Sequence, residues 1–311
     1  MRQAVGIDLG GTFMKGAVVT EEGCIVHKEE IPTEAEKGAA DVLVRMERFV
    51  RDLAAGIRKD AGSFAGVGIG IPGFIDDTSG VAVEVVNMGW RRVEVRAVLA
   101  KRLGLPVYLD NDANVAALGE AWAGAGRGRK LALCVTLGTG VGGGIVIDGR
   151  VLRGANTMAG EIGHIVLEPG GAPCNCGLHG CLETLASATG VVRLAKEAVA
   201  RGVPSALPEE GLTSADVFAA AGRGDEAARQ ATDHAVESLG RGLAIGANIL
   251  NPEVIVVGGG MSKAGDALFA PLRAAFARYA LARVGEAVEI VPAALGNDAG
   301  VVGAAKLALY A

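Results

Sequence analysis

Apolar and polar residues follow two different periods along this chain, and the switches between them predict its elements. Mostly apolar stretches at 5–9, 67–71 and 105–109 are typical of buried strands. Between the first two stretches, apolar residues recur at helical spacing and predict an amphipathic helix over about residues 39–59. Strands that alternate with helices in this way predict an α/β protein.

The most informative pattern is a weak internal repeat. The sequence VGIDLGGT at 5–12 is echoed by CVTLGTG at 134–140. In each copy an apolar strand enters a Gly/Thr turn, and a second apolar strand follows at 15–19 or 144–147, as in hairpins. Because 311 residues suit two domains, we expect two lobes that each open with a hairpin and face each other across a cleft.

One predicted strand leads directly into a candidate helix start. After the strand at 105–109, Asn111 or Asp112 can cap a helix that runs to about Ala123. This places Asp112 at the carboxyl end of a strand, where ligands bind in open α/β sheets. Further along, the pattern predicts a strand at 254–257 and helices at about 184–200, 225–250 and 264–279.

Composition and charge narrow the classes of function. Half of the residues are hydrophobic, yet no apolar run reaches the roughly 18 to 20 residues that span a bilayer. Asp8 interrupts the first apolar stretch before a signal peptide could form. A net charge of -5 argues against a nucleic-acid surface. Three of the five cysteines crowd into 174–181, which indicates metal binding in a reducing compartment. We therefore expect a cytoplasmic protein that acts on small molecules.

Both Gly/Thr turns are candidate phosphate-binding turns. Their consecutive glycines expose backbone N–H groups that can donate to phosphate oxygens. Glycines that only serve two tight hairpins are the alternative. The second turn also satisfies the G-x-G-x-x-G dinucleotide fingerprint, but a strand at 145–147 follows it where the fingerprint requires a helix. The chain contains no GxxxxGK[ST] loop, so it is not a P-loop enzyme.

The strongest single motif is the cysteine-rich sequence CNCGLHGC at 174–181. Its three thiols and His164 would make a closed tetrahedral Zn²⁺ site of the structural type. His179 is the competing imidazole, but it lies inside the loop between two cysteines, where ligation would be strained. Three thiols without a metal are the alternative. Cys24 and Cys134, in strand-like segments, are expected to be small buried residues.

Asn111-Asp112 is a short signal that a helix cap alone would explain. Phosphoryl transfer to an alcohol needs a carboxylate within reach of the hydroxyl proton, together with Mg²⁺ and donors that hold the phosphates. Asp112 suits the role of that carboxylate, because it follows a strand in a chain with two candidate phosphate turns.

With these motifs, the chain resembles the ROK family of sugar kinases and repressors over nearly its whole length. The family's C-x-C-G-x-x-G-C-x-E motif, preceded by G-E-x-G-H, is matched in full by residues 174–183 and 160–164. The resemblance implies an actin-like ATPase (ribonuclease H-like) fold. A small α/β lobe would span 1–112, completed by 298–311, and a large lobe with the zinc motif would span 113–297. It also implies an ATP-dependent and Mg²⁺-dependent hexose kinase, with glucose as the first expected substrate, that forms a homodimer or homotetramer.

The resemblance also implies a role for each matching residue. Asp112 looks like the catalytic base. The residues that look like sugar contacts are Gly73, Asn87, Asn111, Asp112, Glu161, His164 and Glu183. Those that look like nucleotide contacts are Asp8, Gly10, Gly11, Thr12, Lys15, Thr139, Gly140, Gly258, Gly259 and Gly260. The expected zinc ligands are His164, Cys174, Cys176 and Cys181, so that His164 would serve zinc and sugar together.

Three other functions stay open at this point. A kinase for fructose, mannose, allose or N-acetylmannosamine would share these motifs. A sugar-responsive repressor would carry a helix-turn-helix before the first phosphate strand, and we expect none here because that strand begins by Ala4. A dinucleotide-dependent oxidoreductase would need a helix where the second hairpin strand follows Gly144.

Overall fold

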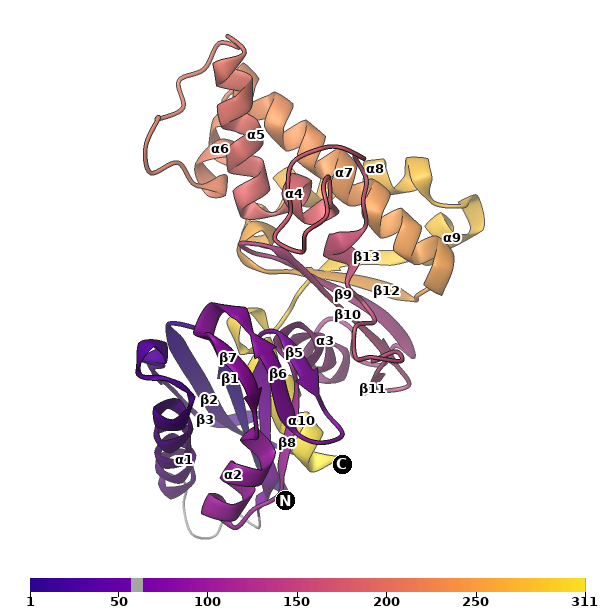
Figure 1. Cartoon of the computed structure of the whole chain (residues 1–311). Coiled ribbons are helices and arrows are strands. Elements are labelled where there is room, and N and C mark those ends of the chain that lie inside the picture. The colour runs from indigo at the N-terminus through magenta and orange to yellow at the C-terminus, as the bar shows by residue number, and fades with distance from the viewer. Residues whose placement is uncertain (57–63, 311) are drawn as a thin grey trace. The chain divides into compact units, whose positions relative to one another are not determined.

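The computed structural model describes residues 1–56 and 64–310, and the chain divides into two compact units. The first unit comprises residues 1–130, 144–159 and 294–311, and the second comprises 131–143 and 160–293. The first unit extends beyond the expected boundary at residue 112, because α3 (Asp112–Ala123) packs against the C-terminal helix α10 (Ala299–Leu309) of the same unit (Figure 1).

A five-stranded sheet of order β3-β2-β1-β4-β8 forms the first unit's framework. Its strands are β1 (Gln3–Leu9), β2 (Phe13–Thr20), β3 (Ile25–Pro32), β4 (Phe64–Ile71) and β8 (Val107–Asn111). β2 pairs antiparallel with β1 and β3, whereas β4 runs parallel to both β1 and β8. The predicted first hairpin is confirmed, and so are the next two strands, although β8 begins at Val107 and ends at Asn111.

Side chains of β1 alternate between two apolar layers, as the period of a strand requires. Val5 and Ile7 join the core that includes α1 (Ala39–Ala55) and α2 (Val95–Leu103), whereas Ala4 joins the layer formed by α10. Gly6 allows α10 to approach closely, because a Cβ there would lie 1.9 Å from the carbonyl oxygen of Val301. The helix predicted over 39–59 is confirmed to Ala55, and its expected last residues, 57–59, lie outside the described residues.

The remaining elements of the first unit are short. A three-stranded antiparallel sheet consists of β5 (Phe74–Asp76), β6 (Val81–Val85) and β7 (Trp90–Val93). β11 (Arg150–Val151) pairs with the end of β10 (Val141–Ile147), the strand within which the boundary between the units falls. The 3₁₀ helices are η1 (Ala35–Lys37), η2 (Val86–Met88) and η5 (Gly296–Asp298).

In the second unit, strands follow the order β10-β9-β12-β13. They include β9 (Leu131–Leu137), β12 (Val254–Gly258) and β13 (Glu289–Pro292), and β12 is parallel to both of its neighbours. β9 and β10 are adjacent strands joined by the turn at 138–140, which confirms the second predicted hairpin. The strand predicted at 254–257 is β12.

Helices of the second unit cover its sheet (Figure 1). They are η3 (Ile162–His164), α4 (Leu182–Ala186), α5 (Ala188–Ala200), α6 (Ser214–Gly222), α7 (Glu226–Leu250), η4 (Gly260–Ala264), α8 (Asp266–Tyr279) and α9 (Ala282–Ala287). The single helix predicted over 184–200 is two helices, because Ser187 is extended and caps α5 by accepting the Gly190 N–H. The sequence pattern does not predict α6.

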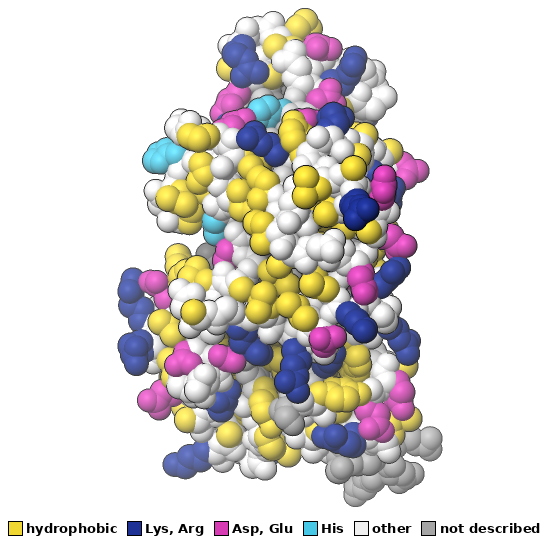
Figure 2. All heavy atoms as spheres, turned by 90° about the vertical axis from the view of Figure 1, so that its right-hand side faces the viewer, with side chains coloured by type: hydrophobic (Ala, Val, Ile, Leu, Met, Phe, Trp, Pro, Cys, Tyr) yellow, Lys and Arg dark blue, Asp and Glu magenta, His cyan; other side chains and the backbone are white. Residues whose placement is uncertain are grey.

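Surface charge, helix hydropathy and the two remaining cysteines can be compared with the sequence. On the face that Figure 2 shows, basic side chains are interspersed with acidic ones and form no continuous basic stripe. Among the helices of the described residues, none is both long and apolar enough to span a membrane. Cys134 is buried as expected, but Cys24 is exposed, because it lies in the turn before β3 and not within a strand.

Candidate active site

The predicted catalytic segment lies where β8 ends and α3 begins. Asn111 caps the helix: its Oδ1 accepts hydrogen bonds from the N–H groups of Ala113 at 2.9 Å and Asn114 at 3.2 Å. Its Nδ2 donates to the carbonyl oxygen of Gly73 at 3.1 Å. The structure thus brings two of the predicted sugar residues, Asn111 and Gly73, into contact.

Gly73 has a backbone conformation that favours glycine. Its φ is +104°, and a Cβ there would lie 2.3 Å from the carbonyl oxygen of Glu84. The position therefore excludes side chains and keeps the loop after β4 close to Asn111. Asn87, another sugar residue predicted in the first unit, is exposed in η2.

Two aspartates of the first unit, Asp8 and Asp112, are close enough for their charges to interact. Asp112 is the first residue of α3, and its Oδ1 accepts the Ala113 N–H at 2.9 Å. Burial raises the pKa of Asp112 above that of an ordinary aspartate. Burial also raises the pKa of Asp8 to about 6, and the Asp112 carboxylate adds to this rise while Lys15 opposes it. A carboxylate whose pKa lies closer to neutrality is a better proton acceptor near neutral pH.

The first candidate phosphate turn is held at its base and open at its tip. The Gly10 N–H donates to the carbonyl oxygen of Phe13 at 3.0 Å, and the hydroxyl of Thr33 donates to the carbonyl oxygen of Gly10 at 2.6 Å. Gly11 and Thr12 are exposed, and a Cβ added to Gly11 would meet nothing within 4 Å. The backbone at the tip is therefore accessible to a ligand.

In the second unit the four predicted metal ligands lie together. The ligating atoms of His164, Cys174, Cys176 and Cys181 are all within 4.8 Å of one another. Cys174 Sγ lies 3.6 Å from His164 Nδ1, and Cys176 Sγ lies 3.7 Å from Cys181 Sγ. Three thiols and one imidazole are the donor set of a structural Zn²⁺ site. His179, the competing imidazole, is exposed and is not in this cluster.

Local electrostatics distinguish the thiols of this cluster. Burial raises the pKa of Cys174 to about 12, whereas the Leu178 N–H lowers the pKa of Cys176. A bound metal would have to displace the thiol protons, since the thiolate is the ligand form. Glu161 Oε2 lies 3.8 Å from His164 Nε2, the ring nitrogen that faces away from Cys174. A carboxylate in this position orients a metal-binding histidine.

Glu183, on α4, links the cysteine cluster to the second phosphate turn. Its Oε2 accepts the Val141 N–H at 3.0 Å, and its Oε1 lies 3.5 Å from Cys174 Sγ. A Cβ on Gly140 would lie 2.2 Å from Glu183 Oε2, so a side chain there would displace this carboxylate. The predicted sugar residue Glu183 therefore also supports the turn that contains Thr139 and Gly140.

Further contacts fix the second turn within the second unit. The Ala188 N–H donates to the carbonyl oxygen of Gly138 at 2.8 Å, and the Thr189 hydroxyl donates to that of Thr139 at 2.8 Å. The start of α5 thus holds the turn. In the predicted adenosine segment Gly258–Gly260, a Cβ on Gly259 would lie 2.3 Å from the carbonyl oxygen of Leu137, so this segment packs at the end of β9.

A cavity of about 710 Å³ lies beside the second turn. It is lined by Thr139, Ala188, Thr189, Val192, Arg193, Lys196, Glu197, Ala200, Leu212, Thr213 and Ser214. Seven of these eleven residues lie on α5, and Leu212, Thr213 and Ser214 lie at the start of α6, a helix that the sequence pattern does not predict. The signal that could have revealed α6 is its capping box, in which Thr213 and Asp216 bond each other's backbone N–H groups.

The repeated strand–turn–strand units and the carboxylates at a strand end define an α/β protein of the actin-like ATPase class. The family profile described as "ROK family" matches residues 4–311, and the chain belongs to that family. It is 50% identical to the glucokinase of Halalkalibacterium halodurans, over 97% of this chain and 93% of the relative. It is 39% identical to the glucokinase of Thermotoga maritima, over 97% and 96%.

A solved structure agrees with these relatives. The ROK family glucokinase from Streptomyces griseus, crystallised with glucose and AMPPNP, is 34% identical, with a TM-score of 0.79 over 99% of this chain and 100% of that chain. The fold class and family predicted from the sequence are confirmed.

Proposed function

We infer that this chain is an ATP-dependent hexose kinase that phosphorylates glucose, with Asp112 as the general base. The observation that carries this inference is the junction of β8 and α3, where Asn111 and Asp112 follow a strand and Asn111 contacts the Gly73 loop. The glucokinase relatives and the solved complex with glucose and AMPPNP support the choice of ATP and of glucose.

The chemistry follows from the position of the aspartates. Asp112 accepts the proton of the sugar hydroxyl while the oxygen of that hydroxyl forms a bond to the γ-phosphorus of ATP, and the bond from this phosphorus to the bridging oxygen breaks to release ADP. Asp8 would hold Mg²⁺, which neutralises charge on the phosphates when bound. The raised pKa of Asp112 increases its basicity, which favours this transfer.

Each unit offers separate contacts to the substrates. In the first unit, the open turn at Gly10–Thr12 would donate backbone N–H groups to phosphate, and Asn87 and Asn111 would bind the sugar. In the second unit, Thr139 and Gly140 would bind phosphate, and the adjacent cavity of about 710 Å³ is large enough for an adenosine group.

The second unit also supports a zinc proposal. His164, Cys174, Cys176 and Cys181 would hold one structural Zn²⁺. Because Glu161 lies beside His164 and Glu183 beside Cys174, the bound metal would fix both carboxylates, which we propose as sugar contacts.

We also propose that the protein is cytoplasmic and forms a homodimer or homotetramer. Light scattering coupled to gel filtration would test the oligomeric state.

The decisive experiment is ADP release with saturating ATP and Mg²⁺ across glucose, mannose, fructose, allose and N-acetylmannosamine. Asp112→Asn should lower kcat by roughly 10² to 10⁴-fold, because an amide cannot accept the proton. Asp41→Asn, on the exposed face of α1, is the matched control and should behave as wild type. Sugar binding without phosphorylation would favour a sensor, and near wild-type kcat in Asp112→Asn would exclude Asp112 as the base.

A further inference from the structure

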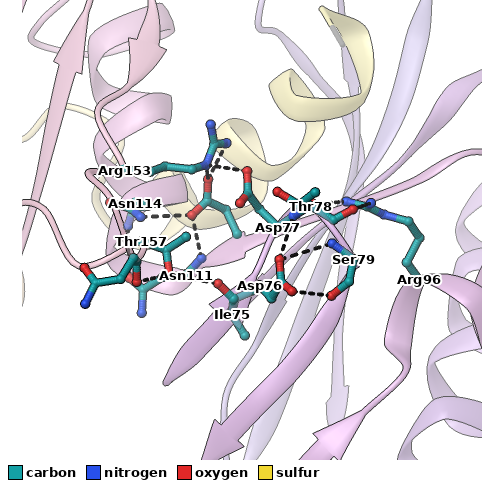
Figure 3. Close-up of polar contacts among 12 residues, drawn as sticks. Ile75, Asp76, Asp77, Thr78, Ser79, Arg96, Asn111, Asn114, Arg153 and Thr157 are labelled. Atoms are coloured by element: carbon teal, nitrogen blue, oxygen red, sulfur yellow. Dashed lines mark hydrogen bonds and ion pairs between the residues drawn. The ribbon is translucent and has the colours of Figure 1, made fainter.

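A single arginine joins three segments of the first unit beside the catalytic junction (Figure 3). Arg153, from the loop after β11, donates from Nε and Nη2 to Asp110 Oδ2, at 3.0 and 2.6 Å. Its Nε also lies 3.0 Å from Asp77 Oδ2, in the turn after β5. One guanidinium thus bridges two carboxylates that are distant from it in sequence.

Asp110 transmits this contact to the residues that follow it. Its side chain is 4% exposed, and its Oδ1 accepts hydrogen bonds from the Asn111 N–H at 2.8 Å and from Asn114 Nδ2 at 2.9 Å. The carboxylate therefore holds the backbone at the end of β8 and a side chain in the first turn of α3. Asp112 lies between these two attachment points, so the orientation of Asp110 constrains the position of Asp112.

The segments around Arg153 are themselves anchored. In the loop after β11, the Thr157 hydroxyl donates to the carbonyl oxygen of Ile75 at 3.0 Å. In the turn after β5, Asp76 accepts the N–H groups of Thr78 and Ser79 at 3.0 and 3.1 Å. Arg96 donates to the carbonyl oxygens of Thr78 at 2.8 Å and of Val107, in β8, at 3.1 Å. Arg153 therefore acts from a fixed support.

We propose that Arg153 is a positioning residue for the phosphoryl transfer: through Asp110 it holds the Asn111–Asp112 junction in the geometry that lets Asp112 reach the sugar hydroxyl. The inference rests on the proposed function of Asp112. A guanidinium suits this role because two of its N–H groups converge on one oxygen of Asp110 and because it keeps its charge at every physiological pH. The contact with Asp77 is more exposed and serves to hold the turn.

The test compares Arg153→Met, Arg153→Lys and Asp77→Asn. Arg153→Met should lower kcat by about 10 to 100-fold, since small displacements of a catalytic group cost about this much, while KM for ATP stays unchanged. Arg153→Lys keeps the charge without the paired hydrogen bonds, so its kcat should lie between those of wild type and Arg153→Met. Asp77→Asn removes the other half of the bridge and leaves the Asp110 contact, so its kcat should stay within about 3-fold of wild type.

Hydrogen exchange supplies a readout independent of turnover. The backbone amides of residues 111–114 should exchange faster in Arg153→Met and should be unchanged in Asp77→Asn.

Two other variants carry the test if Arg153→Met does not fold. Arg153→Lys should keep part of the wild-type kcat, and millimolar guanidinium added to Arg153→Ala should restore part of the kcat that this variant loses. Equal kcat losses in the Asp77 and Arg153 variants would mean a merely structural bridge and overturn the inference. Wild-type protein without sugar-dependent ADP release would overturn the proposed function and this inference together, whereas active wild type with unchanged Arg153 variants would overturn the inference alone.

Discussion

The raised pKa of Asp8 predicts that this carboxylate destabilises the fold at neutral pH. Its pKa rises from 3.8 to about 6, with burial as the main cause and the Asp112 carboxylate as the second. Asp8 is also packed against α10, since a Cβ on Gly300 would lie 2.5 Å from Asp8 Oδ2. At about 1.4 kcal/mol for each tenfold change in proton affinity, the difference corresponds to about 3 kcal/mol.

The sign follows from proton binding in the two states. Below about pH 4, the Asp8 carboxyl is protonated in both the folded and the unfolded chain and costs nothing. Between about pH 4 and 6, the folded chain retains a proton that the unfolded chain releases, so the free energy of unfolding falls as pH rises. Above about pH 6 the full cost is present. Asp8→Asn should therefore raise the free energy of unfolding by about 2 to 3 kcal/mol at pH 8 and by almost nothing at pH 4.

Urea unfolding followed by circular dichroism at a series of pH values measures this difference. Asp41→Asn, an exposed carboxylate on α1, serves as the matched control and should show no comparable gain. Asp8→Asn should also lose the stabilisation that Mg²⁺-AMPPNP gives to wild type, because Asp8 is the proposed Mg²⁺ contact. If Asp8→Asn gains the same stability at every pH, or gains none at about pH 8, the charged form of Asp8 does not destabilise the fold.

Three further predictions follow from other contacts. Elemental analysis should find one zinc per chain in wild type and none in Cys176→Ala, which should also have a lower kcat/KM for sugar. Gly140→Ala should lower kcat/KM for ATP by about 10-fold or more, because its Cβ would collide with Glu183, and steady-state kinetics would show it. Glu120→Gln should lower the free energy of unfolding by about 1 to 3 kcal/mol in urea titrations, because its buried carboxylate accepts three backbone N–H groups.

Local signals explain why the sequence predicted some parts of the fold well. Asn111 was a candidate cap because its side chain can bond nearby N–H groups, and such a bond needs only the next few residues. The two hairpins were predictable for the same reason, since strand period and turn glycines lie within a few residues of each other. The helix break at Ser187 was missed because apolar positions recur on both sides of it and mask a cap that interrupts the backbone.

Long-range contacts explain why the rest could not be predicted. Asp110 is a charged residue within an apolar strand, which signals that a buried carboxylate needs a partner. The sequence could not name that partner, because Arg153 lies 43 residues away and is brought to it only when the loop after β11 folds onto the end of β8. Capping motifs encode where Asp112 stands along the chain, but the contacts that would hold its carboxylate in a reactive position depend on tertiary structure. No local motif distinguishes Arg153, so its proposed role could be inferred only from the folded structure.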